Sequence, residues 1–374
     1  MMKVAIDFTP VIKERYTGFY TYGSNLLKAM QKLDNCPEFS LFYFNRYDDR
    51  AKEIKKELSD SFVLSPTKIK LRWLQKIWNF VPYPPLQKFT GDFDIYHSIF
   101  QLMPPTKGKP RVMTVHDLRR FVLPDFYKES KTEQFQKAIN DVDHIIAISN
   151  STLEDLIKVF KIKKEKISIV HLAHDNDVFS MSSDRIEKAK KFIKNSLSSD
   201  SKFLTTISAS DKRKNCSNTI KAFLKSSISD EYKLVILGYF PKNDQELNFL
   251  LENEKVKKKI FMTGPIEDIN AFIAASDCLI FPTLYEGFGM PIINAQEMGV
   301  PVITSNVSSM PEIGGDAVLL VDPRSIDSIS AAISSLMNNE KLRSDLILKG
   351  KLNSSRFSWG KTAAKTIDVY KKII

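Results

Sequence analysis

Residues 284–304 read "LYEGFGMPIINAQEMGVPVIT", and the six residues before them form the apolar run "CLIFPT". This run predicts a buried strand, because it is apolar on both of its alternating faces. Pro291 fits the first turn of a helix, where its fixed φ is favourable and its missing N–H is not needed. The stretch therefore predicts a strand, a loop with an acid and two glycines, and then a helix, which is the repeating unit of a doubly wound α/β fold.

Runs of the same kind recur along the whole chain. Helical patterns lie between many of them, as in residues 151–160, 216–227 and 325–339. This βαβ alternation predicts parallel sheets with helices on both faces. The twelve predicted strands are residues 3–8, 40–45, 93–99, 111–117, 143–149, 166–172, 202–208, 232–239, 259–264, 278–283, 300–306 and 317–322.

The number of predicted strands indicates two domains. Twelve strands and 374 residues exceed what one open sheet and one core usually organise. After the sixth run, residues 174–202 are polar, serine-rich and charged, which predicts a crossover followed by a surface helix. We place the boundary near residue 176, so that residues 1–175 and 176–357 form two Rossmann-like domains. Ligands of such sheets bind beyond the carboxyl ends of the strands, where the unusual loop residues are expected.

Composition narrows the function classes. The chain has 55 Lys and Arg against 44 Asp and Glu, a net charge of +11, which suits an anionic partner. Zinc-finger spacing and RNP-like aromatic motifs are absent from the sequence, so nucleic acid is not the expected partner. Three widely spaced cysteines fit neither a zinc site nor a disulfide framework. Because the sequence begins without a signal-like segment and has no long apolar run, we expect a soluble, cytosolic protein.

The loop within the quoted stretch combines features of a ligand site. Gly287 and Gly289 allow backbone to approach a ligand, and the N–H groups around Gly289 and Met290 would face an anion at the positive end of a helix. Glu286 can accept hydrogen bonds from hydroxyls. Hydroxyls together with a phosphate describe a nucleotide sugar. Alternatively, the glycines serve only to turn the chain between strand and helix.

Residues 285–323 resemble the donor-site region of the glycosyltransferase family 4 enzymes, which have the GT-B fold. Further segments resemble the family in the same order along the chain. They are "TGFYTYGSNLLKAM" (17–30), "VMTVHDL" (112–118), residues 147–170, "KRKN" (212–215) and "FSWGKTAAKTIDVYKKI" (357–373). The resemblance implies two Rossmann-like domains facing a cleft, with the helix of about 358–374 packed back on the first domain. It also implies retaining transfer of a sugar from a nucleoside diphosphate, without a bound metal or other cofactor.

The resemblance assigns roles residue by residue. Glu286 matches the first acid of the family's E-x7-E pair, which binds sugar hydroxyls, and Lys214 matches the lysine that neutralises the diphosphate. Arg213 would assist Lys214 in holding the leaving group's charge. His116, at the end of a predicted strand, matches the histidine that reaches the sugar, although a histidine in that place is more often structural. The predicted catalytic residues are His116, Lys214 and Glu286, and the predicted donor-binding residues are Gly18, Arg213, Gly287, Phe288, Gly289, Met290 and Asn294.

The sequence also departs from the family pattern. Asn294 stands where the family has the second acid, which usually holds the nucleotide ribose, so we expect donor binding weaker by about 1–2 kcal/mol. Glu297, one helical turn further on, is the candidate substitute. Tyr20 replaces a second glycine near Gly18, and Ser208 and Ala209 replace residues of the phosphate loop. These departures leave open a degenerate, non-catalytic relative that binds a glycan or a partner enzyme.

Acid pairs of the D-x-D type can hold a divalent cation against a diphosphate. Three such triplets occur, at residues 92–94, 141–143 and 175–177. The first two precede strands and so lie at the amino ends, away from the expected site. We interpret all three triplets as structural, and no metal is expected.

Residues 68–89, "KIKLRWLQKIWNFVPYPPLQKF", interleave basic residues with Trp73, Trp78 and Phe80. This composition suits the interface of an anionic membrane, so we hypothesise a peripheral contact with the inner face of the cell membrane. The alternative is an ordinary amphipathic helix packed on the first domain.

The combined prediction is a retaining hexosyltransferase with GDP-mannose as the first donor. Its expected acceptor is a glycan or lipid-linked oligosaccharide in surface polysaccharide or lipopolysaccharide synthesis. A UDP-hexose-dependent transferase is the nearest alternative, and a sugar-nucleotide epimerase on the same scaffold is a second.

Overall fold

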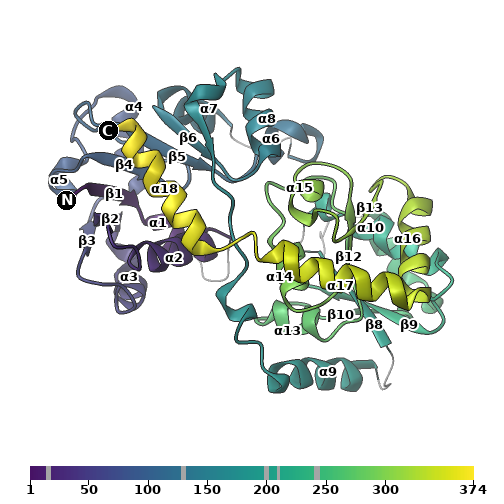
Figure 1. Ribbon diagram of the computed structural model, residues 1–374. Helices are drawn as coiled ribbons and strands as arrows, with labels where there is room; N and C mark the ends of the chain where they lie inside the picture. Colours follow the sequence, from purple (N-terminus) through teal and green to yellow (C-terminus); the bar gives the residue numbers. More distant parts are fainter. Residues whose placement is uncertain (14–17, 128–131, 198–201, 209–210, 240–244) are drawn as a thin grey trace. The chain divides into compact units, whose positions relative to one another are not determined.

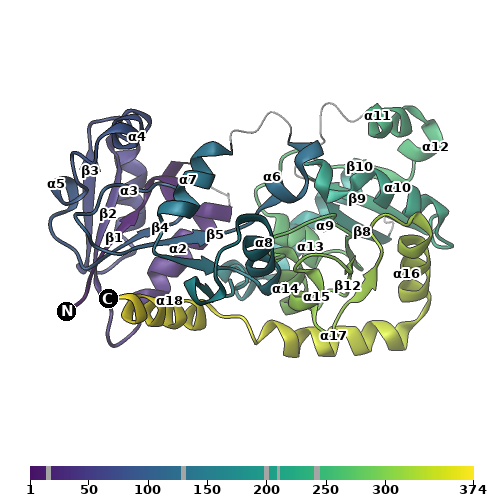
Figure 2. The same ribbon diagram turned by 90° about the horizontal axis from the view of Figure 1, so that it is seen from above.

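The computed structural model divides the chain into two compact units (Figures 1 and 2). Unit 1 comprises Met1–Leu172 and Ser358–Ile374, and unit 2 comprises Ala173–Phe357. The residues described are 1–13, 18–127, 132–197, 202–208, 211–239 and 245–374. Within these residues, no helix combines the length and the apolar character needed to cross a bilayer.

Unit 1 contains a seven-stranded sheet in the order β3-β2-β1-β4-β5-β6-β7, and neighbouring strands pair in parallel. The first strand is central and the order reverses beside it, which is the doubly wound arrangement. The strands are β1 (Lys3–Asp7), β2 (Glu38–Phe44), β3 (Phe62–Thr67), β4 (Ile95–Ser98), β5 (Arg111–Val115), β6 (His144–Ala147) and β7 (Ile167–Ile169).

The helices of unit 1 include one from the far end of the sequence. Helix α18 packs against α2, and Figure 1 shows it in yellow on the unit that carries the N-terminus. The hydroxyl of Tyr370, on α18, lies 2.6 Å from Nδ1 of His97, a buried residue of β4. The helices are α1 (Thr9–Lys13), α2 (Gly18–Met30), α3 (Asp48–Lys55), α4 (Leu71–Phe80), α5 (Gln87–Thr90), α6 (Arg119–Val122), α7 (Glu133–Asp141), α8 (Asn150–Phe160) and α18 (Trp359–Ile373).

Unit 2 contains a six-stranded sheet in the order β10-β9-β8-β11-β12-β13, again with parallel neighbours. Relative to its own first strand this is the same order as in unit 1, without the seventh strand. The strands are β8 (Lys202–Ile207), β9 (Tyr232–Leu237), β10 (Ile260–Met262), β11 (Leu279–Phe281), β12 (Val302–Ser305) and β13 (Leu319–Val321).

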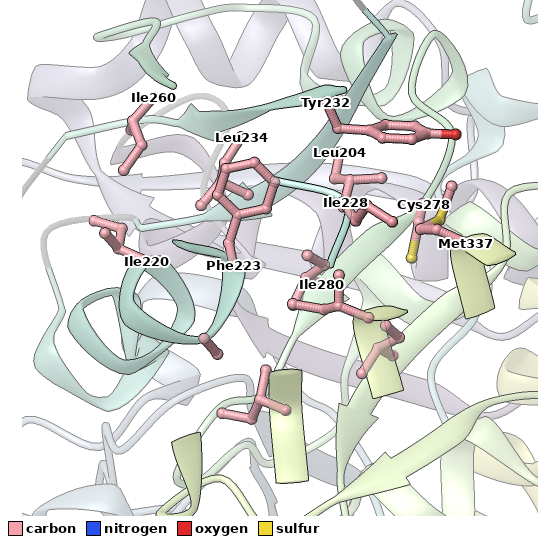
Figure 3. Close-up of a cluster of buried hydrophobic side chains, with 14 of the residues drawn as sticks. Leu204, Ile220, Phe223, Ile228, Tyr232, Leu234, Ile260, Cys278, Ile280 and Met337 are labelled. Carbon is pink, nitrogen blue, oxygen red and sulfur yellow. The ribbon is translucent and has the colours of Figure 1, made fainter. Parts of the chain in front are cut away.

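Both faces of the second sheet are buried under helices. Leu204 and Ile280 belong to one apolar cluster with α10 and α16, shown in Figure 3, whereas their neighbours Phe203 and Leu279 belong to another with α9, α13 and α14. This two-sided burial explains why the strand sequences are apolar on alternating faces. The helices are α9 (Ser183–Leu197), α10 (Cys216–Lys225), α11 (Gln245–Glu252), α12 (Glu254–Lys257), α13 (Ile269–Ala274), α14 (Met290–Glu297), α15 (Met310–Gly314), α16 (Ile326–Asn338) and α17 (Glu340–Ser354).

The predicted α/β fold with two doubly wound parallel sheets is confirmed, and each of the twelve predicted strands is present. Strand β3 was missed. Its sequence, "FVLSPT", contains Ser65 and Pro66, which interrupt the apolar pattern. Because β3 lies at the edge of the sheet, its proline need not donate to a neighbouring strand.

Candidate active site

The candidate site in unit 2 lies where the strand order reverses. Strands β8 and β11 are neighbours in the middle of the sheet, although they are separated along the chain by β9 and β10. The loop after β8 carries the short 3-10 helix Lys212–Lys214, and the loop after β11 carries Glu286. The carboxyl ends of such a strand pair form the usual ligand crevice of an open α/β sheet.

Two cations meet one carboxylate oxygen between these loops. Nη1 of Arg213 and Nζ of Lys214 each lie 2.5 Å from Oε1 of Glu286. All three side chains are about nine-tenths buried. Asp211 also holds Arg213, since its Oδ2 accepts from Nε at 2.8 Å. The four side chains form a charge cluster with two positive and two negative groups, which lets each charge be buried with a partner.

The charge cluster fixes the ionisation of its acid. Burial alone would raise the pKa of Glu286, but the charges of Lys214 and Arg213 and the hydrogen bonds they donate lower it to about 2. Burial lowers the pKa of Lys214, and the Arg213 charge acts in the same direction against the attraction of Glu286. Nζ of Lys214 also lies 4.6 Å from the ring centroid of Phe281. Glu286 is therefore a carboxylate at neutral pH.

Backbone and hydroxyl contacts hold the two loops together. The N–H of Leu284 donates to the carbonyl of Arg213 at 2.8 Å, and the hydroxyl of Thr283 donates to the same carbonyl at 3.0 Å. The turn after β12 adds support: Ser308 Oγ accepts from the N–H of Glu286 at 3.1 Å, and Ser309 Oγ donates to its carbonyl at 2.9 Å. The position of Glu286 is thus fixed from both sides of its backbone.

Residues 286–289, "EGFG", differ in what each contributes to the loop. Gly289 has φ +114°, and a Cβ there would lie 2.7 Å from Cε of Met310, so this position requires glycine. Phe288 is buried and packs edge-to-face on Phe357, with ring centroids 5.6 Å apart, so its side chain belongs to the core. Met290 is the first residue of α14, and Gly287 lies buried between Glu286 and the helix. The loop therefore presents backbone, rather than the Phe288 ring, beside Glu286.

The side-chain amide of Asn294 forms hydrogen bonds with Asp175 and Asn270. Its Oδ1 accepts from the N–H of Asp175 at 3.0 Å, and its Nδ2 donates to Asp175 Oδ2 at 2.8 Å and to Asn270 Oδ1 at 3.1 Å. Glu297 lies elsewhere on the helix surface, where Ser354 of α17 donates to Oε2 at 2.7 Å. The structure thus does not bring Asn294 into the charge cluster with Glu286, and Glu297 does not join Asn294.

The three D-x-D triplets each contribute side chains that hydrogen-bond or pair with other residues of the protein. Asp94 and Asp143 each accept a hydrogen bond from the backbone at a strand start, from Lys3 and Arg111 respectively, at 2.8 Å. Asp177 pairs with Arg185 at 2.8 Å. Among the described residues, no three His, Cys, Asp or Glu side chains lie close enough together to hold a metal ion.

His116 lies in unit 1, directly after β5. Its Nε2 is 3.1 Å from the carbonyl of Ile99, so Nε2 carries the proton and donates. The rings of Tyr22 and Phe19 meet it edge-to-face, with centroids at 4.8 and 5.0 Å. Burial lowers its pKa to about 4, against the opposing charge of Asp117. His116 is therefore a neutral hydrogen-bonding group at physiological pH.

A cavity of about 240 Å³ adjoins His116. Its lining includes Phe19, Phe100 and Thr114, together with Arg119, which Asp117 pairs at 2.7 Å. Gly18, the first residue of α2, is exposed, and a Cβ added at this position would meet open space. Tyr20 lies on the same helix, whereas Ala209 lies outside the described residues.

Sequence reasoning missed two members of these contacts. Asp211 precedes Arg213 by two residues, and its side chain also accepts from the Arg213 N–H at 3.1 Å, a local turn that the "DKR" spacing could have indicated. Asp175 was interpreted only as part of a structural D-x-D. Its pairing with Asn294 joins residues 119 positions apart, for which the sequence carries no local signal.

Two family models match the chain in sequence order. "Glycosyltransferase Family 4" matches residues 21–178, and "Glycosyl transferases group 1" matches residues 187–353. The first match lies largely in unit 1 and the second within unit 2.

Individual proteins resemble the chain over its full length. It is 27% identical to O-antigen chain mannosyltransferase B of Escherichia coli, over 99% of this chain and 100% of that protein. The crystal structure of a glycosyltransferase from Rickettsia africae superimposes with a TM-score of 0.73 at 17% identity, covering 100% of this chain and 98% of the other. HepE of Anabaena in complex with UDP-glucose gives a TM-score of 0.74 at 14% identity, covering 100% of both chains. With both family models matched and the GT-B architecture shared, the chain belongs to the family 4 glycosyltransferases.

Proposed function

We propose that this glycosyltransferase is a retaining, metal-independent mannosyltransferase that uses GDP-mannose. Its acceptor would be a growing surface polysaccharide, such as an O-antigen chain, or its lipid-linked precursor. The observation that carries the proposal is the charge cluster, in which Arg213 and Lys214 meet Glu286 where the strand order reverses between β8 and β11. A backbone hydrogen bond joins the two loops that carry these residues. In this proposal the two cations bind the diphosphate, and the carboxylate binds hydroxyls of the sugar.

The two cations would stabilise the leaving nucleoside diphosphate. A buried guanidinium and ammonium act on developing negative charge more strongly than exposed ones, and their positions are already fixed before reaction. They would thereby supply the positive charge that a divalent cation supplies beside the phosphates in phosphoryl-transfer enzymes. Because Glu286 now occupies both cations, a bound diphosphate competes with it for them. Its carboxylate is then available to accept hydrogen bonds from the hydroxyls of the donor sugar.

His116 would contribute as a neutral hydrogen-bonding group in unit 1. Since Nε2 donates to Ile99, the lone pair of Nδ1 is the acceptor that the ring offers. A neutral ring beside a sugar hydroxyl can orient it without adding positive charge. Retention of the anomeric configuration follows if the acceptor hydroxyl arrives on the face from which the diphosphate leaves.

The choice of mannose rests on the full-length similarity to an O-antigen mannosyltransferase. A UDP-hexose donor is the second candidate, because HepE of Anabaena, with the same fold, was crystallised with UDP-glucose. Both candidates need the same cations, and they differ in the nucleotide base and in the sugar.

Isothermal titration calorimetry without metal would test the donor site. GDP-mannose, GDP, UDP-glucose and UDP would be titrated into the wild type, Lys214→Ala and Lys212→Ala. Lys212 is the matched control, because it lies in the same short helix but is exposed. We expect one nucleotide pair to bind, with affinity lowered at least ~30-fold by Lys214→Ala and little changed by Lys212→Ala.

Failure of all four ligands to bind at millimolar concentration would reject the transferase proposal and favour a non-catalytic relative. Selective binding of UDP and UDP-glucose would reject GDP-mannose while keeping the site. The anomeric configuration of the product, read by NMR from a mannose-terminated acceptor, would test retention separately.

A further inference from the structure

Helix α4 of unit 1 has two apolar faces. One face packs on the sheet: Leu74 is fully buried in an apolar cluster that includes Phe42 and Tyr96, and Leu71 and Trp78 pack against the same cluster. The indole N–H of Trp78 donates to the carbonyl of Pro84 at 2.8 Å, which holds the chain leaving the helix. This face accounts for the position of α4 in the fold.

A second face of α4 is apolar and exposed. Trp73 is 50% exposed, Ile77 44% and Phe80 88%. At about 100° per residue, Trp73 and Phe80 lie roughly 100–160° around the helix from Leu74 and Trp78, and Ile77 lies at the border between the two groups. Val81 and Tyr83 continue the exposed apolar surface beyond the helix end. Packing within unit 1 therefore explains only one of the two faces.

Basic side chains flank the exposed apolar face. Lys76 Nζ lies 4.8 Å from the ring centroid of Trp73, and the guanidinium of Arg72 lies 5.7 Å from it. Residues 61–91 contain five Lys or Arg and no Asp or Glu. Exposed aromatic side chains beside cations suit a surface that is apolar below and anionic at its boundary.

A basic groove of about 510 Å³ adjoins the segment that follows α4. Tyr83 and Lys88 line it together with Lys107, Lys109 and Arg111 from the loop before β5 and its first residue. Asp143 is the acidic residue of the lining, and its Oδ2 lies 3.6 Å from Nε of Arg111. The positive charge thus extends from α4 across a neighbouring concave surface.

We propose that the exposed face of α4 and the adjoining basic groove dock unit 1 on an anionic lipid bilayer. The helix is ten residues long, about 15 Å, so it lies along the interface with Trp73, Ile77 and Phe80 inserted among the lipid chains. The cations contact lipid phosphates. Charge complementarity favours this occupant over a second copy of the chain, because two copies of the same basic surface repel each other. The surface goes beyond the transfer reaction and does not depend on the identity of the donor.

Vesicle co-sedimentation of the full chain, without nucleotide, would test the proposal. Phosphatidylcholine vesicles with and without phosphatidylglycerol would be compared at low and high salt. We expect binding to the anionic vesicles, at least ~10-fold weaker binding to the neutral ones, and loss of affinity with salt. Absence of binding to anionic vesicles at low salt would overturn the proposal.

Paired variants separate this surface from the general positive charge of the chain. Trp73→Ser/Phe80→Ser and Arg72→Glu/Lys76→Glu should each lower the vesicle affinity at least ~10-fold. Leu348→Ser/Leu352→Ser and Lys341→Glu/Lys349→Glu, at exposed positions of α17, are the matched controls and should bind like the wild type. Equal binding by the α4 variants would assign binding to another surface and overturn the proposal.

Tryptophan fluorescence gives a second measurement on the same surface. Brominated lipids should quench the wild-type emission, and Trp73→Phe should remove most of the quenching, because Trp359 is buried and Trp78 is partly covered. If the α4 substitutions instead change the sedimentation coefficient of the chain without vesicles, the face is an interface between copies, and the bilayer proposal is wrong.

Discussion

The two units share a strand order but carry different side chains at the carboxyl ends of their strands. In unit 2, the loops after β8 and β11 bring together Arg213, Lys214 and Glu286 as buried, mutually paired charges. In unit 1, the end of β5 carries His116, which is neutral and surrounded by the rings of Phe19 and Tyr22. The same backbone frame thus supports a cluster of buried, paired charges in one unit and a neutral imidazole among aromatic rings in the other.

This difference shows that strand topology determines where a site lies, and loop residues determine what it can bind. A charged cluster is suited to a diphosphate. An aromatic surface with a neutral imidazole is suited to sugar rings and hydroxyls. Substitutions in each unit in turn can test whether the two sites have these different roles.

Glu286→Gln should have the largest effect. It leaves Lys214 and Arg213 buried without their shared carboxylate, so we expect the free energy of unfolding to fall by about 3 kcal/mol and transfer to fall at least ~100-fold. Nucleoside diphosphate binding should persist or strengthen, because the competing carboxylate is gone. Chemical denaturation, an activity assay and calorimetry would measure the three quantities.

Glu297→Gln is the control for this change, since its carboxylate accepts from the neutral hydroxyl of Ser354 at 2.7 Å and lies 3.8 Å from the half-exposed Lys351. It should cost less than about 1 kcal/mol and retain transfer. Loss of nucleotide binding in Glu286→Gln would contradict the idea that Glu286 and the diphosphate compete.

In unit 1, His116 should make the free energy of unfolding depend on pH. The pKa of His116 is about 4 in the folded chain, below the ordinary value of 6.5, so its contribution to stability is fully present above pH 6.5. As the pH falls from 6.5 towards 4, the unfolded chain binds a proton that the folded chain does not, and roughly 3 kcal/mol is lost. Denaturation of the wild type and His116→Gln at several pH values would measure this contribution.

Asp7 titrates in the opposite direction over part of this range, because burial raises its pKa to about 7. The difference between the wild type and His116→Gln removes that contribution, which both proteins share. A difference that does not change between pH 6.5 and 4 would show that His116 titrates normally.

Asn294→Glu should destabilise unit 2 by about 2 kcal/mol. It places a second carboxylate beside Asp175, whose pKa burial already raises despite hydrogen bonds from Asn270 and Asn294. Asp175→Asn in the same chain should recover most of the loss. A double-mutant cycle measured by denaturation should give a coupling above about 1 kcal/mol, and additive effects would contradict direct contact.

Two glycines provide the smallest test. Gly289→Ala should cost about 1–2 kcal/mol, because φ is +114° and the new methyl group meets Met310. Gly18→Ala should change the free energy of unfolding by less than about 0.5 kcal/mol, because its surroundings are open. Thermal denaturation would compare the two. A loss of transfer in a stable Gly18→Ala protein would indicate that a ligand approaches this backbone.

The sequence predicted most of the architecture, because buried parallel strands are apolar on both faces and their loops carry glycine and proline signals. Edge strand β3 lacked that pattern, since Ser65 and Pro66 are tolerated where one side has no neighbour. The resemblance to family 4 also indicated Arg213, Lys214 and Glu286 as site residues, and the fold brings their side chains together. Their selection depended on matching motifs, since residues 72 positions apart carry no local sign of contact.

The environment of Asn294 could not be predicted in the same way. The motif identified the missing acid, but the partner that explains the amide, Asp175, lies before α9 and meets it only in the folded unit. For α4, the sequence suggested membrane contact through Trp73, Trp78 and Phe80, but it could not show that the fold partly covers Trp78 and leaves Trp73 and Phe80 exposed. The sequence of α4 indicates amphipathicity, whereas the burial of Leu74 and the exposure of Phe80 become distinguishable only when the helix is placed on the sheet.

Helix α18 has a consequence for the order in which the chain can mature during synthesis. Residues Ala173–Phe357 are contiguous, so unit 2 can finish folding as soon as they leave the ribosome. Unit 1 cannot finish folding at that stage, because the buried His97 pairs with the hydroxyl of Tyr370, which is 273 positions later in the chain. The unit translated first is therefore the last to be completed, and a chain released early, before Trp359, would expose the surface of α2 that α18 normally covers.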